Sequence, residues 1–478
     1  MSVTRYFILA AAFLYVLIRA ITVGVTYDEV WTINQFVKLP LKDILSFTPA
    51  DANNHLLNTL FIKGCFYSLG NSLFVARLPN VLAFALYLYF AHRITKTLPQ
   101  ILGNCSLLVL VLNPFLLDFF GLARGYGLSM GFLMAALFYV LLYVDFGSWK
   151  ALLKALLFGG LAVISNFVLL HFWVSTLAVI AVVSLLARRG KSVQALLMIA
   201  VFSFLLFKTI KVPLQKLRES GSLYYGGGEG FYTDTMQSLL TSSAYAHQPT
   251  PMLLFIGNGL LLLMVITILF SFFIRHKLNT PKTALFLISG LSVCSVVAQH
   301  YLLGTLYLID RTALLFYPLL ILCFCFAAVD TPKVFRYSAL AIVVSVLSVN
   351  FLLHANFSKT LIWDFDSRTE TMLNEVNRLG ASQNRKVKLD YSWPFQNSVA
   401  YYLNKKSFPF IENTNNRAQR DSLNSRAEIY FYLARPMEKV WYFAASQKVL
   451  SCPRRTLRTF PSEQIFVFDL HRDSLKSN

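Results

Sequence analysis

Long apolar runs separated by short polar segments fill the first 354 residues of the chain. A helix needs about 20 apolar residues to cross the hydrocarbon layer of a membrane, because no water there can satisfy an open backbone. Eleven runs are predicted as spans, at 6–25, 73–94, 99–117, 125–145, 151–166, 168–187, 193–212, 251–274, 283–303, 311–329 and 335–354. The pattern therefore predicts an all-α polytopic membrane bundle of about eleven transmembrane helices.

The pattern changes after residue 354. Short runs with the composition of β-strands alternate there with polar or helical stretches such as Ser367–Leu379. The predicted strands are Val387–Tyr391, Ile429–Leu433, Val440–Phe443 and Ile465–Leu470. We therefore expect a transmembrane domain over 1–354 and a small soluble α/β domain over 355–478, with a structural role or a role in docking an acceptor.

The positions of Lys and Arg predict the orientation in the membrane, because cytoplasmic loops are enriched in both residues. Basic residues occupy alternate loops: Arg93 and Lys96; Lys150 and Lys154; Arg188, Arg189 and Lys191; Arg275, Lys277 and Lys282; Lys333 and Arg336. The N-terminus is then cytoplasmic, and the first run is a retained signal anchor. Loops 26–72 and 213–250, the turn near 118–124 and the C-terminal domain are extracytoplasmic. Loop 213–250, with its glycine run, suits a flexible lid and equally a plain connector.

The composition excludes an ordinary soluble enzyme. Only 14% of the residues are charged and 56% are hydrophobic, whereas soluble domains are about 25% charged. The net charge of +20 suggests nucleic acid at first sight. The basic residues lie in short loops and in the tail, however, and this distribution favours anionic lipid headgroups over nucleic acid. The six cysteines show neither a Cys-x-x-Cys pair nor zinc spacing.

A pair of carboxylates follows the first apolar run directly. Asp28 and Glu29 stand between Tyr27 and Trp31, whose rings would shield them in part from water. A partly buried carboxylate has a raised pKa, which suits a general base. The alternative is an ordinary helix cap or interface residue.

A second polar cluster occupies 51–58 in the same loop, with the sequence Asp-Ala-Asn-Asn-His-Leu-Leu-Asn. Its side chains, Asn54 and His55 among them, have the chemistry to orient a sugar or a phosphate. The alternative is a polar turn that opens a helix.

Two further clusters lie at the external ends of later spans. Asp118 precedes Arg124 and Tyr126 around the external turn, and Asp310 precedes Arg311 at the start of the tenth span. An arginine at a membrane boundary needs an anion or a polar cavity. Its planar guanidinium group can form two hydrogen bonds to a phosphate. Acids and arginines on one face of the membrane indicate transfer from a lipid-phosphate donor to an acceptor hydroxyl.

These motifs resemble those of the GT-C-fold membrane glycosyltransferases, which include protein O-mannosyltransferases and lipid A aminoarabinose transferases. The resemblance covers about the first 145 residues in order. Beyond them only the hydropathy and Arg311 resemble the family pattern, and the His-Pro-Pro-type segment lacks its prolines here. The matching elements are Asp28-Glu29, Asn53-Asn54-His55-Leu56-Leu57, Ala76-Arg77-Leu78-Pro79, Asn113-Pro114-Phe115 and Ala123-Arg124-Gly125-Tyr126.

The resemblance implies a polyprenyl-phosphate sugar donor and inversion at the anomeric carbon. Asp28 would then be the general base, and Glu29 would orient another residue or cap a helix. Arg124, Arg311 and His55 would bind the donor phosphate. Asn54, Asp118 and Tyr126 are the predicted substrate-binding residues.

We expect no cofactor and no essential metal, because no ligand spacing requires one; an ion approached by Asp28, Asp118 and His55 is the alternative. The acceptor is a lipid, a glycan or a protein, and the expected location is a bacterial inner membrane. A transporter or flippase of a lipid-linked saccharide is the alternative function, although the spans lack the mid-membrane charges and repeats expected of one. A non-catalytic scaffold whose tail binds a partner is the third hypothesis.

Overall fold

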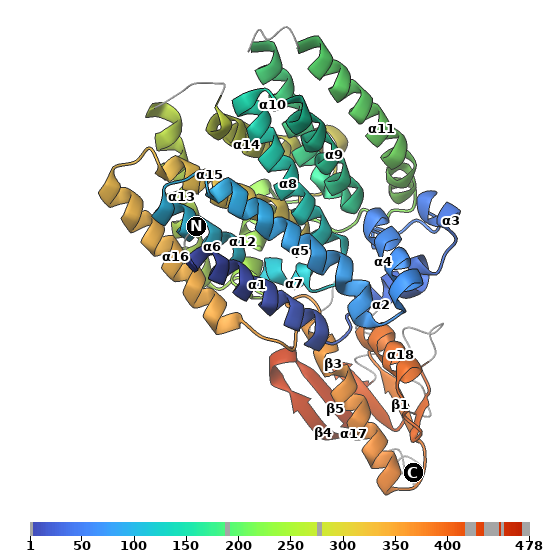
Figure 1. The fold of residues 1–478 in the computed structure, drawn as a ribbon. Coiled ribbons are helices and arrows are strands. Elements are labelled where there is room, and N and C mark those ends of the chain that lie inside the picture. Colours follow the sequence, from blue (N-terminus) through green and yellow to red (C-terminus); the bar gives the residue numbers. More distant parts are fainter. Residues whose placement is uncertain are drawn as a thin grey trace. The chain divides into compact units, whose positions relative to one another are not determined.

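The computed structural model describes residues 3–186, 192–274, 280–415, 427–434, 449–450 and 454–470. The chain divides into two compact units (Figure 1). The first comprises Met1–Ile21 and Gln35–Asn356, and the second comprises Thr22–Asn34 and Phe357–Asn478. The predicted domain boundary at 354 did not anticipate that residues 22–34, with Asp28 and Glu29, group with the C-terminal tail.

The first unit is a helical bundle. All eleven predicted runs are helical in whole or in large part. The long helices are α1 (Val3–Thr22), α5 (Leu73–Thr95), α8 (Gly125–Phe146), α9 (Trp149–Ser165), α10 (Leu170–Leu186), α11 (Ser192–Glu219), α13 (Pro251–Ile274), α14 (Pro281–Leu303), α15 (Phe316–Ala328) and α16 (Lys333–His354). The short helices η2 (Phe167–Leu169) and η4 (Asp310–Leu315) precede α10 and α15. The predicted class, a polytopic α-helical membrane bundle with a small α/β domain, is confirmed.

The predicted count of eleven spans is not confirmed. Within the described ranges, nine helices are long and apolar enough to cross a membrane, or up to ten with α6 (Gln100–Val111) and α7 (Pro114–Phe120) counted as one bent span. That pair bends by 66° at Asn113-Pro114, where proline cannot donate a backbone hydrogen bond and the Asn113 side chain caps α7 through Leu116 N. Helix α9 has 17 residues, about 25 Å at 1.5 Å per residue, which is less than a typical hydrocarbon layer.

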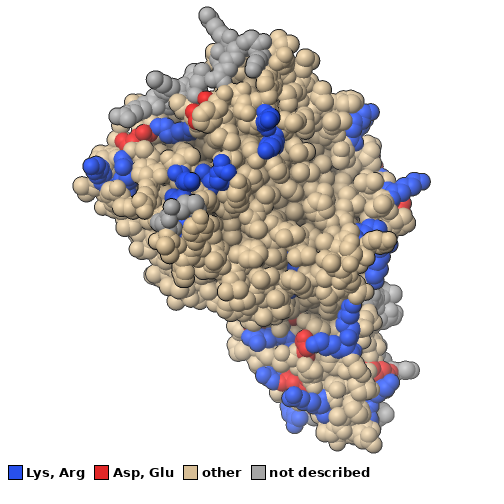
Figure 2. All heavy atoms as spheres, viewed as in Figure 1, with Lys and Arg blue, Asp and Glu red and all other residues tan. Residues whose placement is uncertain are grey.

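The surface of the first unit is apolar enough to face lipid. Helix α13 buries only Met264, Thr267 and Ser271, and its Phe255 and Phe273 are 81% and 77% exposed. On the face shown in Figure 2, uncharged side chains cover a broad area of this unit, and Lys and Arg gather toward its margins. Large exposed apolar surfaces are rare on soluble monomers, so the chain is an integral membrane protein.

The two long loops, 26–72 and 213–250, carry helices of their own. The first contains η1 (Ile33–Val37), α3 (Leu41–Leu45) and α4 (Leu56–Leu69), and the second contains η3 (Phe231–Met236) and α12 (Gln237–Ser243). Lys63 of α4 donates to the carbonyls of Val37 and Leu39 at 2.9 and 2.8 Å. Gly227 and Tyr307 exchange two backbone hydrogen bonds, which attach the second loop to the segment before η4.

The second unit contains a five-stranded mixed sheet of order β2-β1-β3-β5-β4. Its strands are β1 (Val387–Tyr391), β2 (Ile411–Asn413), β3 (Ile429–Leu433), β4 (Arg455–Phe460) and β5 (Ile465–Asp469). Strand β1 pairs in parallel with β2 and β3, and β5 pairs antiparallel with β3 and β4. The predicted strands at 387, 429 and 465 are present, and Val440–Phe443 lies outside the described residues.

Helices complete the second unit. They are η5 (Asp364–Arg368), α17 (Thr369–Ser382), η6 (Trp393–Phe395), α18 (Gln396–Lys405), η7 (Pro461–Glu463) and the short α2 (Tyr27–Thr32). Helix α2 packs on α18. Apolar side chains of α17, α18 and the sheet, such as Met372, Val399 and Phe431, are fully buried and form the core.

Candidate active site

His55 is the buried residue around which the polar cluster of the first unit gathers. It precedes α4 as its N-cap residue and is 7% exposed. Its Nε2 has no hydrogen-bond partner among the described residues. Gly125 makes room for it, since a Cβ there would lie 2.6 Å from His55 Cβ and 2.3 Å from the Ser165 carbonyl oxygen. Glycine at 125 therefore lets the start of α8 approach both His55 and the end of α9.

Tyr126, in the first turn of α8, joins His55 to Arg311. Its ring packs edge-on against the His55 imidazole, with centroids 4.9 Å apart. Its hydroxyl accepts a hydrogen bond from Arg311 Nε at 3.1 Å. The Arg311 guanidinium also stacks on the ring of Tyr225, 4.2 Å from the centroid. A guanidinium group has the donor geometry for a bidentate contact to an anion.

Arg124 is the second cation of this cluster. It immediately precedes α8, its side chain is 2% exposed, and its Nη1 donates to the Asn53 carbonyl at 3.1 Å. That contact places the guanidinium beside the residues that lead into α4. The structure thus brings together Arg124, Tyr126, Arg311 and His55, four of the predicted site residues that come from three separate stretches of sequence.

The residues around His55 shift the pKa of its imidazole. Burial lowers the pKa of His55 well below its ordinary value of 6.5, and the charges of Arg124 and Arg311 lower it further, while a hydrogen bond with the Ser165 backbone opposes the shift. The imidazole is therefore neutral near pH 7, so the positive charge of the cluster resides on the two guanidinium groups. An anion is the ligand that such a cluster would take.

A network of buried amides holds the elements of this cluster. Asn80 Nδ2 donates to Asn58 Oδ1 at 2.8 Å, and Asn80 Oδ1 accepts from Leu128 N at 2.8 Å. Asn58 Nδ2 donates to the Ala123 carbonyl at 3.2 Å. Asn80 was not singled out from the sequence, although a polar residue inside an apolar run was the available signal. Asn54 is buried and its Oδ1 accepts from the Thr59 hydroxyl at 2.9 Å.

Asp310 organises the loop beside Arg311. Its φ of 46° is in the left-handed region, which non-glycine residues rarely adopt. Its carboxylate accepts from the hydroxyls of Tyr225 at 3.0 Å and Ser242 at 2.9 Å, and its N–H donates to Ser238 Oγ. These bonds connect loop 213–250 to η4, so Tyr225 faces Arg311 from that loop.

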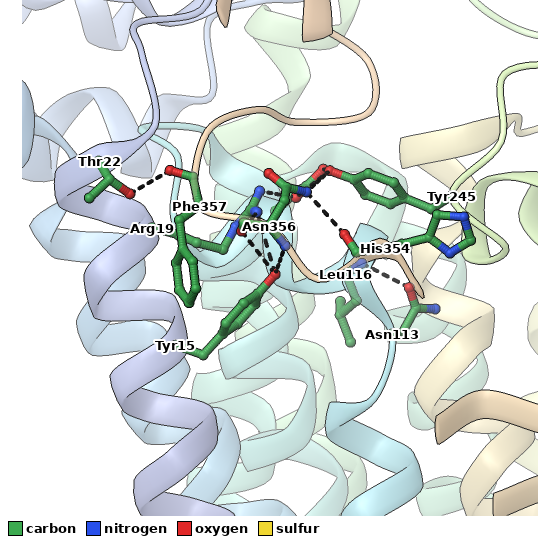
Figure 3. Close-up of polar contacts among 10 residues, drawn as sticks. Tyr15, Arg19, Thr22, Asn113, Leu116, Tyr245, His354, Asn356 and Phe357 are labelled. Carbon is green, nitrogen blue, oxygen red and sulfur yellow. Dashed lines mark hydrogen bonds and ion pairs between the residues drawn. The ribbon is translucent and has the colours of Figure 1, made fainter. Parts of the chain in front are cut away.

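Asp118 lies in a different polar cluster. Its carboxylate forms an ion pair with Arg19 of α1 and accepts from the Tyr245 hydroxyl at 3.0 and 3.2 Å. Arg19 also donates to the Asn356 carbonyl, and Tyr15 and Asn356 surround it (Figure 3). Asp118 is therefore engaged by residues of its own bundle, away from the contacts of His55.

Asp28 and Glu29 lie in the second unit, at the second and third positions of α2. Asp28 is half-buried, whereas Glu29 is fully buried. Glu29 Oε2 accepts from Thr26 N at 3.0 Å, and Thr26 and Glu29 form a capping box. This geometry gives Glu29 the capping role that was one of its two predicted alternatives. Asp28, the other carboxylate of the pair, is the less buried of the two.

No group of three His, Cys, Asp or Glu residues in the described ranges is arranged to hold a metal ion. Of the three residues that could have approached one ion, His55 and Asp118 lie in separate clusters of the first unit and Asp28 belongs to the second.

The fold has relatives among solved structures. This combination of a polytopic helical bundle and a small mixed-sheet unit is a GT-C fold. In particular, the chain is similar to the crystal structure of ArnT from Cupriavidus metallidurans in the apo state, with a TM-score of 0.53 and 7% identity over 97% of each chain. A second crystal structure of that ArnT, bound to undecaprenyl phosphate, gives a TM-score of 0.48 at 9% identity over 98% of each chain.

No protein-family model matches the chain, and no curated protein does. The fold expected from the resemblance is confirmed, and the function has to be argued from the site.

Proposed function

We propose that this protein is an inverting glycosyltransferase that moves a sugar from a polyprenyl-phosphate donor to an acceptor hydroxyl on the extracytoplasmic face of the membrane. One observation carries the proposal: a GT-C-fold bundle gathers two arginines and a neutral histidine around one tyrosine. Arg124 and Arg311 would bind the donor phosphate, and His55 Nε2 would add a polar contact. The fold supports this class of reaction because it is the fold of membrane glycosyltransferases.

The reaction needs a base and a stabilised leaving group. Asp28 removes the proton of the acceptor hydroxyl, whose oxygen attacks the anomeric carbon as the bond to the phosphate oxygen breaks. A positioned general base contributes about 10²–10⁴ to the rate. Negative charge grows on the departing phosphate, and the two guanidinium groups stabilise it. A direct displacement of this kind inverts the anomeric configuration, as in the single-step hydrolases.

The orientation and location belong to the same proposal. The alternation of basic loops supports a cytoplasmic N-terminus and an extracytoplasmic C-terminal domain, in a bacterial inner membrane. The chemistry above requires no metal, because the guanidinium groups supply the positive charge.

The test compares cell envelopes with and without the protein by mass spectrometry of glycans, glycolipids and glycoproteins. We expect one sugar modification to disappear with the protein, and to disappear equally in Asp28→Asn. Asp43→Asn, a half-buried aspartate of α3, is the matched control and should restore the modification. Undiminished product in Asp28→Asn would remove the proposed base. Movement of a lipid-linked saccharide across vesicles without any covalent product would instead establish the transporter.

A further inference from the structure

Helix α2, which carries Asp28, is too short to be stable alone. It has six residues, whereas isolated helices shorter than about 12–15 residues are marginal in water. Its capping box adds on the order of 1 kcal/mol, which does not fix the direction in which the helix points. The orientation of Asp28 therefore depends on what α2 packs against.

The C-terminal part of the second unit holds the residue before Asp28 from both sides of its backbone. Asp366 Oδ2, in η5, accepts the N–H of Tyr27 at 2.6 Å. Asn397 Nδ2, in α18, donates to the Tyr27 carbonyl at 3.2 Å. Both side chains are buried, with 1% and 9% exposure. Two hydrogen bonds to one peptide residue fix both its position and its rotation.

Two further contacts hold the same segment. The Tyr402 hydroxyl accepts the Val25 N–H at 3.4 Å, and the rings of Tyr27 and Trp393 pack with centroids 5.1 Å apart. Gly24 lies under Tyr402, where an added Cβ would be 3.2 Å from the hydroxyl. These residues come from positions about 370 apart in the sequence, so the contact is a built feature of the unit and not a local turn.

We propose that the C-terminal part of the second unit positions the catalytic base, and that Asp366 and Asn397 are the positioning residues for Asp28. The inference rests on the proposed function, because it assigns Asp28 the role of base. It replaces the expectation of a merely structural or acceptor-docking tail with a specific role in catalysis.

The state of Asp366 fits this role. Burial raises its pKa well above the ordinary value, hydrogen bonds from Ser398 and the Tyr27 backbone act in the opposite direction, and the charges of Asp28 and Glu29 raise it further. A raised pKa favours the uncharged acid, which can still accept the Tyr27 N–H and adds no negative charge beside the base. Asparagine has nearly the same shape and the same acceptor, so Asp366→Asn should substitute for the acid, whereas Asp366→Ala removes the contact.

The first measurement is hydrogen–deuterium exchange in the detergent-solubilised full-length protein, read from peptides that cover residues 22–34. We expect faster exchange there in Asp366→Ala and Asn397→Ala, and wild-type exchange in Asp366→Asn. Two controls remove side chain-to-backbone bonds elsewhere in the unit: Asp390→Ala, which frees Tyr391 N, and Asn377→Ala, which frees Phe410 N. Wild-type exchange of residues 22–34 in Asp366→Ala and Asn397→Ala would overturn the proposal.

The second measurement is the amount of modified envelope product per folded protein. A misplacement of about 1 Å lowers rates by on the order of 10²-fold, so we expect a loss of roughly 10- to 100-fold in Asp366→Ala and near-wild-type product in Asp366→Asn. Equal losses in Asp390→Ala would reveal a general folding defect and overturn the positioning role. Equal product in wild type and Asp28→Asn would overturn the proposed function, whereas a lost product in Asp28→Asn with full product in Asp366→Ala would overturn this inference alone.

Discussion

Arg19 and Asp118 form an ion pair that is almost completely enclosed, with side-chain exposures of 2% and 3%. The pair joins α1 to α7, and the Tyr245 hydroxyl and the Asn356 carbonyl complete it. The ion pair and its two neighbours thus connect the first helix, the broken span and the segment that follows α16. The structural role of this carboxylate is better supported than the substrate-binding role predicted for it from the sequence.

Asp118→Ala should destabilise the protein strongly. Removal of one partner leaves the Arg19 charge buried without its counterion, and such changes lower the free energy of unfolding by about 3–5 kcal/mol. Thermal unfolding in detergent measures the change. The double variant Arg19→Met/Asp118→Leu removes both charges and should recover most of the loss, since buried pairs are often replaceable by apolar residues. An unchanged melting temperature in Asp118→Ala would contradict a stabilising role for the ion pair.

Gly125→Ala should damage the site by steric means. Its Cβ would enter the space of the Ser165 carbonyl and the His55 side chain, so α8 would have to move away from α4 and α9. We expect loss of product and a lower melting temperature. Gly160→Ala is the matched control, because a Cβ at that position of α9 meets nothing within 4 Å and alanine favours a helix over glycine by about 1 kcal/mol. A Gly125→Ala protein with wild-type product and stability would contradict the close packing of α8 against His55 and the end of α9.

The sequence predicted the helices well because an apolar run of sufficient length has few alternatives in a membrane. The break at Asn113-Pro114 was visible as a motif, yet its effect on the span count was missed because hydropathy does not register a missing backbone donor. The strands at 387, 429 and 465 were predictable from β-rich composition, whereas the parallel pairing of β1 with β2 and β3 depends on long-range packing that no local pattern encodes.

Less of the candidate site than of the fold was predictable from the sequence. Arg124 and Arg311 stood out because charged residues at span boundaries are costly unless they bind something. The partners of Asp118 and Tyr27 were not predictable, because Arg19 lies within an apolar run and Asp366 lies 339 positions away from Tyr27. Long-range hydrogen bonds leave no local signature. For the same reason the association of residues 22–34 with the tail was missed.

The aromatic ring of Tyr225 should contribute more to product formation than its hydroxyl. The ring supports the Arg311 guanidinium by a cation–π contact, which is worth about 0.5–2 kcal/mol, whereas the hydroxyl binds Asp310. We expect Tyr225→Phe to keep most of the product and Tyr225→Ala to lose roughly 2- to 30-fold, from the same energies. Phe204→Ala is the control, since Phe204 stacks with Lys208 on the exposed side of α11. Equal losses in the Phe and Ala variants would show that the hydroxyl carries the effect.

Binding of a lipid phosphate should tighten as the pH falls, because of His55. In the free protein the pKa of His55 is well below 6.5, owing to burial and then to Arg124 and Arg311. A bound phosphate offsets the two positive charges, so the pKa of His55 is higher in the complex than in the free protein. Binding is then coupled to proton uptake. The affinity rises as the pH falls through the pKa of His55 in the complex, and it levels off below the pKa of His55 in the free protein.

A polyprenyl methyl phosphodiester is the suitable probe because it does not itself titrate near neutral pH. Its affinity for the wild type should increase as the pH is lowered, by at most about tenfold per pH unit, which is the limit for one proton. His55→Gln should remove this pH dependence while retaining the wild-type melting temperature. The same pH dependence in both proteins would show that another group takes up the proton.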